Sequence, residues 1–115
     1  MGPVEEHYDR GVAYKIAGNY EEAAAEFQAI LSVEPGNAKA HRQLGLVYGF
    51  MGLFDESIEE LRTAVDLDGH DLDARNDLAL TYTMLGMMEE AKAHFESVLE
   101  ADPDNAVAKK NLIYF

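Results

Sequence analysis

Cysteine is absent from the 115-residue chain, and proline occurs only three times. The lack of cysteine excludes disulfides, thiolate nucleophiles and cysteine-ligated zinc. No apolar run approaches the roughly 18 residues that are needed to cross a bilayer, so we expect no membrane insertion. The N-terminus also lacks the basic-then-apolar order of a signal peptide. We therefore expect a cytoplasmic protein, or a periplasmic one if a leader has been removed.

Basic residues are also scarce. Nine Lys and Arg stand against 22 Asp and Glu, which gives a formal net charge of -13. A phosphate backbone would be repelled by this charge, so nucleic acid is not an expected partner. The acidic surplus favours either a solvated face that keeps the protein soluble or a surface that attracts a basic partner.

What is present is a repeat with a period of 34 residues. The recurring positions form three triplets: Tyr14, Tyr48 and Tyr82; Gly18, Gly52 and Gly86; and Tyr20, Phe54 and Met88. Apolar residues at helical spacing precede and follow each glycine, which predicts a helix, a turn and a second helix in every unit. We therefore predict an all-α protein of about seven helices without a strand. The predicted units are residues 4–37, 38–71 and 72–105, followed by a trailing helix over 106–115.

Small residues also recur in register. They are Gly11, Gly45 and Ala79 in the first helices, and Ala23, Ser57 and Ala91 in the second helices. A small side chain at these places lets the two helices of a hairpin approach closely, and a larger one would overpack the contact. Each hairpin alone leaves an apolar face open, so the units are expected to stack.

The pattern resembles the tetratricopeptide repeat, a helix-turn-helix unit of 34 residues. The second unit carries the family's residues in His41, Leu44, Gly45, Tyr48, Gly52, Phe54, Ser57, Leu61 and Ala64. The resemblance implies a right-handed superhelical array of antiparallel helical hairpins, an α-solenoid. It also implies a non-enzymatic scaffold that binds a peptide or partner helix in a concave groove lined by the first helix of each repeat.

The family pattern places particular residues in that groove. They are Glu5, Tyr8, Asp9, Val12, Lys15, Lys39, Arg42, Gln43, Leu46, Phe50, Asp73, Asn76, Asp77, Leu80, Thr83 and Met84, with Lys110 and Tyr114 on the trailing helix. Apolar and charged side chains alternate in this set. We therefore expect a protein or peptide partner with apolar anchors and a basic segment near Asp73 and Asp77.

One subfamily of these repeats clamps the C-terminal carboxylate of heat-shock chaperones with Lys, Asn and Arg. The corresponding positions of this chain hold Tyr8, Val12, Gln43, Asp73 and Asp77. Acids where bases are required would repel a carboxylate, so the sequence predicts that chaperone C-termini are not the ligand.

The alternative function is a structural module that self-assembles through its terminal repeats. It rests on the apolar C-terminal residues Leu112, Ile113, Tyr114 and Phe115. Exposed apolar residues of this kind drive association, so a homo-oligomer is the alternative prediction. His7 and His41 share a register, but that position is a packing one in the family, and we expect neither metal nor cofactor.

Overall fold

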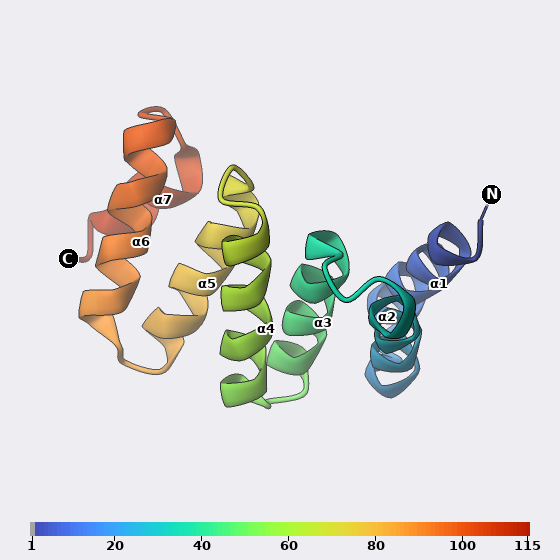
Figure 1. The fold of residues 1–115 in the computed structure, drawn as a ribbon. Helices are drawn as coiled ribbons and strands as arrows, with labels where there is room; N and C mark the ends of the chain where they lie inside the picture. The colour runs from blue at the N-terminus through green and yellow to red at the C-terminus, as the bar shows by residue number, and fades with distance from the viewer. Residues whose placement is uncertain (1) are drawn as a thin grey trace.

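The computed structural model describes residues 2–115, and within them it contains seven helices and no strand. The helices are α1 (Pro3–Ile16), α2 (Tyr20–Val33), α3 (Ala38–Phe50), α4 (Phe54–Leu67), α5 (Leu72–Met84), α6 (Met88–Ala101) and α7 (Ala106–Leu112). The helices stack as antiparallel hairpins from the N-terminus to the C-terminus (Figure 1). The all-α prediction is therefore confirmed. No helix in the described range is long and apolar enough to cross a membrane.

Glycine ends the first helix of each hairpin. Gly18, Gly52 and Gly86 have φ angles of 82°, 78° and 75°. These are the left-handed values that glycine adopts without strain from a Cβ atom. In all three places the backbone N–H of the residue after the glycine donates to a carbonyl of the preceding helix. Asn19, for example, donates to the carbonyl of Tyr14 over 2.8 Å. This is a Schellman-type helix end, and it recurs at the predicted period.

An acceptor side chain begins the first helix of each following unit. Asn37, Asp71 and Asn105 each accept a hydrogen bond from the backbone N–H three residues later, over 2.9 Å, 3.1 Å and 3.1 Å. Such N-caps satisfy a backbone donor that the helix itself leaves open. These caps explain why the turns between units end where they do.

The small residues lie where the helices approach most closely. A Cβ atom on Gly11 would lie 2.6 Å from Phe27, and one on Gly45 would lie 2.8 Å from Leu61. Ala79, the equivalent residue of the third unit, is fully buried. The predicted close approach is therefore present at Gly11 and Gly45, and the equivalent Ala79 is buried.

The core consists of two apolar clusters that meet at the hairpin of α3 and α4. One joins α1, α2 and α3, and the other joins α4, α5, α6 and α7. At the junction, the buried Ser57 hydroxyl donates to the carbonyl of Gly45 over 2.7 Å. Because each cluster draws on more than one repeat, every hairpin depends on a neighbour to bury its apolar face.

Candidate peptide-binding groove

The first helices α1, α3 and α5 carry the predicted groove residues, and an apolar hollow lies between α3 and α5. Its volume is about 270 Å³. Its apolar side chains are Leu46, Phe50, Phe54, Leu80 and Met84. A volume below the usual range for drug-sized ligands suits one or two side chains of a partner.

Two hollows with charged residues in their lining adjoin the first and second repeats. One, of about 350 Å³, is lined by Val4, Glu5, Tyr8, Asp9, Glu34, Asn37 and Lys39. The other, of about 370 Å³, is lined by Tyr8, Lys39, Arg42, Asp68, Asp71 and Asp73. Tyr8 and Lys39 line both, so the two hollows are neighbours. A partner in this region meets both signs of charge.

Arg42 and Asp77 form an ion pair between α3 and α5. The Arg42 Nε donates to Asp77 Oδ2 over 2.6 Å, and both side chains are largely buried. Burial raises the pKa of the Asp77 carboxyl, although the hydrogen bond and charge of Arg42 oppose that rise. Desolvation offsets much of the attraction in buried pairs, and this pair links α3 to α5 across neighbouring repeats.

A second polar link joins α1 to α3 through Gln43. The Lys15 Nζ donates to Gln43 Oε1 over 2.6 Å, and Gln43 Nε2 donates to the Tyr8 hydroxyl over 3.1 Å. Burial, followed by the charge of Arg42, lowers the pKa of Lys15. Gln43 therefore holds two residues of the preceding repeat in place.

Two of the predicted groove residues are not presented to a partner. Gln43 is only 8% exposed and Asn76 only 3%. Asn76 Nδ2 donates to the side chain of Asn105 over 3.1 Å, which ties α5 to the cap of α7. The sequence placed both in the groove because their register is correct, but their side chains connect repeats.

The other predicted residues differ in how far they reach solvent. The exposed ones are Glu5, Asp9, Lys39, Phe50, Asp73 and Met84. The half-buried ones are Tyr8, Val12, Lys15, Arg42, Leu46, Asp77, Leu80 and Thr83. Ile16 was not predicted, yet it is 80% exposed and shares the register of Phe50 and Met84. The 34-residue period contained the signal that would have found it.

The histidines pair within repeats. His7 Nδ1 lies 2.9 Å from Glu26 Oε2, and His41 Nδ1 lies 2.9 Å from Glu60 Oε2. Within residues 2–115, no group of three or more His, Cys, Asp or Glu residues is placed to hold a metal ion. His7 and His41 therefore link the two helices of their own hairpins.

The C-terminal apolar residues are only partly packed. Leu112 packs against the second core cluster, and the Phe115 ring lies 6.3 Å from that of Phe95. Ile113 and Tyr114 are 78% and 82% exposed. The predicted self-association segment thus has two apolar side chains that the described chain leaves uncovered.

Comparison with known proteins gives one consistent family. Two family profiles described as tetratricopeptide repeat match the chain, one over residues 51–113 and the other over residues 4–37. No curated protein sequence matches it. Among solved structures, the first such domain of Spaghetti (RPAP3) bound to the HSP90 peptide SRMEEVD has a TM-score of 0.91 at 24% identity, covering 96% of this chain and 88% of that one.

Two further structures share the fold. The second domain of human RPAP3 in complex with the HSP70 peptide SGPTIEEVD has a TM-score of 0.89 at 28% identity, covering 98% of this chain and 97% of that one. The Sgt2 domain from Aspergillus fumigatus has a TM-score of 0.90 at 20% identity, covering 99% of this chain and 77% of that one.

These structures overturn the exclusion of chaperone C-terminal peptides. That prediction is wrong, since two domains of this fold hold such peptides. The exclusion assumed that Asp73 and Asp77 meet a ligand as free acids. Asp77 is instead bonded to Arg42, and Asp73 shares its hollow with Lys39 and Arg42. The charge that a ligand meets therefore differs from what residue types at five positions indicated.

Proposed function

We propose that this chain, which belongs to the tetratricopeptide repeat family, is a non-enzymatic scaffold that binds a peptide segment or partner helix in the groove of α1, α3 and α5. The observation that carries the proposal is the apolar hollow between α3 and α5. Phe50 and Met84 at its mouth are 61% and 65% exposed. Burying such side chains against a partner is favourable, and a few large apolar contacts commonly dominate binding energy.

Charged residues beside the hollow can set the direction of the partner. Lys39 and Asp73 are exposed, and both line the polar hollow next to Arg42. Charges at the rim of an interface fix register and exclude wrong partners more than they add affinity. The two solved domains that hold chaperone peptides support a peptide as the occupant of this fold.

Selection from a random peptide library followed by calorimetry tests the groove. The enriched peptides and the peptide SGPTIEEVD are titrated into the wild type and into a Leu46→Ala/Leu80→Ala variant. Removing the Leu46 and Leu80 side chains from the lining of the hollow should weaken the binding of an enriched peptide at least about tenfold. The matched control is Val33→Ala/Leu67→Ala, which removes apolar side chains that are exposed outside the groove. Equal weakening in both variants, or a library without an enriched peptide, contradicts the proposal.

Self-assembly through the terminal repeats is the second candidate function. The observation that favours it is the exposure of Ile113 and Tyr114, at 78% and 82%. Sedimentation velocity at about 100 µM protein should show a concentration-dependent species, which Ile113→Asp/Tyr114→Asp abolishes. A monomer at every concentration removes this candidate.

A further inference from the structure

The last residue of each first helix is large, apolar and exposed. These residues are Ile16, Phe50 and Met84, at 80%, 61% and 65% exposure. They are spaced by the 34-residue period, so they stand at equivalent places on α1, α3 and α5. We call these three residues the apolar row.

The fold does not need apolar side chains at these three positions. A basic residue would suit the last turn of a helix better, because the carbonyl end of the helix dipole is negative. The Phe50 side chain is partly covered on this surface, since its ring stacks on that of Tyr20 at 5.4 Å and 15°. Ile16 and Met84 stay mostly in solvent. Three recurring exposed apolar residues indicate a surface that another molecule covers.

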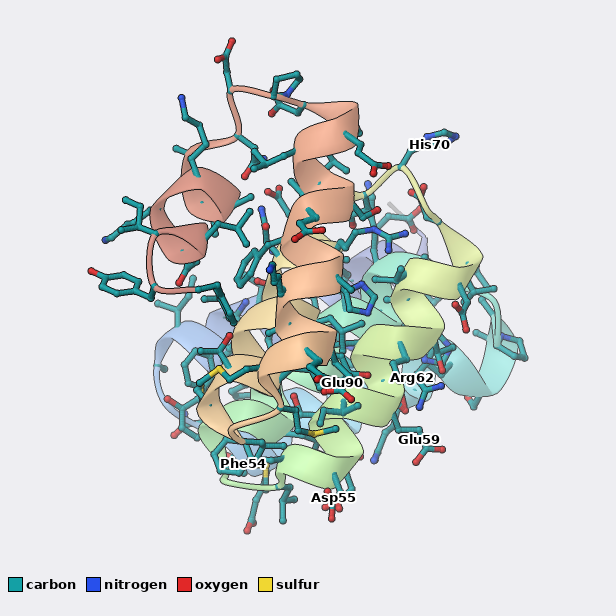
Figure 2. All side chains as sticks on the ribbon, turned by 90° about the vertical axis from the view of Figure 1, so that its left-hand side faces the viewer. Phe54, Asp55, Glu59, Arg62, His70 and Glu90 are labelled. Carbon is teal, nitrogen blue, oxygen red and sulfur yellow. The ribbon has the colours of Figure 1, made fainter. Side chains whose placement is uncertain are left out.

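Acids follow the same edge of the array. Glu21, Asp55 and Glu89 are the second residues of α2, α4 and α6, and all three are exposed. Figure 2 shows Phe54 and Asp55 at the start of α4, and Phe54 lines the hollow with Phe50 and Met84. Within residues 2–115, none of these three acids forms an ion pair. We call them the acidic row.

The spacing of the apolar row distinguishes a helix from an extended chain. Hydrogen bonds between side chains join α1 to α3 and α3 to α5, so successive members of the row are separated by roughly one helix-packing distance, 8–10 Å. On a partner helix, residues seven apart lie on one face and about 10.5 Å apart, at 1.5 Å per residue. In an extended chain, residues three apart span about 10 Å but point to opposite faces. A helix can therefore place an apolar side chain at every member of the row, whereas a straight strand cannot.

We propose that a basic amphipathic helix of a partner protein lies across the turn edge of the array. Its apolar residues at positions i, i+7 and i+14 contact Ile16, Phe50 and Met84, and its Lys or Arg residues face Glu21, Asp55 and Glu89. This inference rests on the proposed scaffold function and names the chemistry of one partner. It extends the contact surface from the apolar hollow, which Phe50 and Met84 line, to Ile16 and the acidic row at the turn edge.

A designed helix tests the proposal directly. The probe is a labelled peptide of about 21 residues with Leu at i, i+7 and i+14 and Lys along one flank, and its binding is followed by fluorescence anisotropy. A scrambled peptide of the same composition and a peptide with Glu in place of Lys are the reference probes. The designed helix should bind at least about tenfold tighter than either one. Raising NaCl from about 50 mM to about 500 mM should weaken binding of the designed helix.

Two variants of the protein separate the apolar and acidic contributions. Ile16→Ser/Met84→Ser should weaken the designed helix at least about tenfold, whereas the matched control Val33→Ser/Leu67→Ser should change binding less than about twofold. Far-UV circular dichroism checks that each variant keeps its helices.

The charge variant removes the acidic row without reversing it. Glu21→Gln/Asp55→Asn/Glu89→Gln should weaken binding and remove most of its salt dependence. Glu59→Gln/Asp66→Asn/Glu100→Gln changes the net charge equally on exposed residues of the second helices, so it is the matched control. The proposal is overturned if either control variant weakens binding of the designed helix as much as the row variant to which it is matched.

The groove variant Leu46→Ala/Leu80→Ala distinguishes failure of this inference from failure of the scaffold function. If library peptides bind but the designed helix does not, or if the helix binds no better than its scrambled form, the edge site is wrong while the groove stands. If neither class of peptide binds the wild type, both proposals fail. Loss of helix binding in the charge variant with retained binding of library peptides supports a contact surface beyond the groove, because none of its three residues lines the apolar hollow.

Discussion

Two glycines of α3 should respond to alanine with opposite signs. A Cβ atom on Gly45 would lie 2.8 Å from Leu61 Cγ and 3.2 Å from the Ser57 backbone oxygen, and Leu61 is fully buried. A Cβ atom on Gly49 would lie 3.4 Å from its nearest neighbour, the Ser57 hydroxyl. The first contact requires core atoms to move, whereas the second is close to an ordinary van der Waals distance.

The expected magnitudes follow from two opposing effects. Replacing glycine by alanine inside a helix stabilises it by about 0.5–1 kcal/mol. Overpacking of a well-filled core destabilises by about 1–3 kcal/mol. Gly49→Ala should therefore raise the free energy of unfolding by about 0.5–1 kcal/mol, and Gly45→Ala should lower it by about 1 kcal/mol or more.

Urea denaturation followed by far-UV circular dichroism measures both changes, since the slope should stay constant while the midpoint moves. A third arm combines Gly45→Ala with Leu61→Ala. If the overlap with Leu61 is the cause, Gly45→Ala should cost less in that background, and the difference is the coupling energy of the pair. Equal stability of the Gly45→Ala and Gly49→Ala proteins would refute the close-approach reasoning.

Two further changes probe the joint between repeats and the third hairpin. Gly69 stands where the other two units have proline, and its N–H makes no hydrogen bond among the described residues. Asp68 before it has an extended φ of -141°, which a following proline favours. Gly69→Pro should therefore raise the free energy of unfolding by about 0.4–1 kcal/mol in urea denaturation. Burial, then the charges of Arg75 and Arg62, lower the pKa of His94. The unfolded chain therefore takes up the proton more readily, and stability should be complete above about pH 6.5 and fall as the pH drops below it. Denaturation across pH should show a smaller fall for His94→Gln than for the wild type.

The helices were predictable because the residues that end them recur at a fixed interval. Gly18, Gly52 and Gly86 end the first helices with positive φ, and a residue without Cβ at a fixed interval is visible in the sequence. The helix starts were harder to find. Asn37 and Asp71 cap through their side chains, but each lies among other turn-forming residues whose role is not distinguished by type alone.

The residues predicted for the groove on α1, α3 and α5 differ in how far their side chains are exposed. Gln43 and Asn76 occupy groove positions, yet both are buried by links to the neighbouring unit. Ile16 is the opposite case, a residue that is exposed but was not predicted. Its exposure follows from the register that it shares with Phe50, but the family pattern does not include it. The register of a residue sets the direction of its side chain, but contacts with the neighbouring repeat determine whether that side chain stays exposed to a partner.

Equivalent residues of successive repeats and residues that bond one another between repeats are separated by different numbers of residues. This difference explains why the charge at Asp77 was misread. Residues 34 apart occupy the same place in successive repeats, whereas two of the polar links between α1, α3 and α5 join residues 35 apart: Tyr8 to Gln43, and Arg42 to Asp77. Tyr8 and Arg42 share one register, and Gln43 and Asp77 share the next. The side chain at one position of a repeat is thus bonded by the side chain one position further on in the following repeat. Charge in the groove must therefore be counted over such pairs, and by that count the acid at Asp77 is compensated while the acid at Asp73 remains exposed to a ligand.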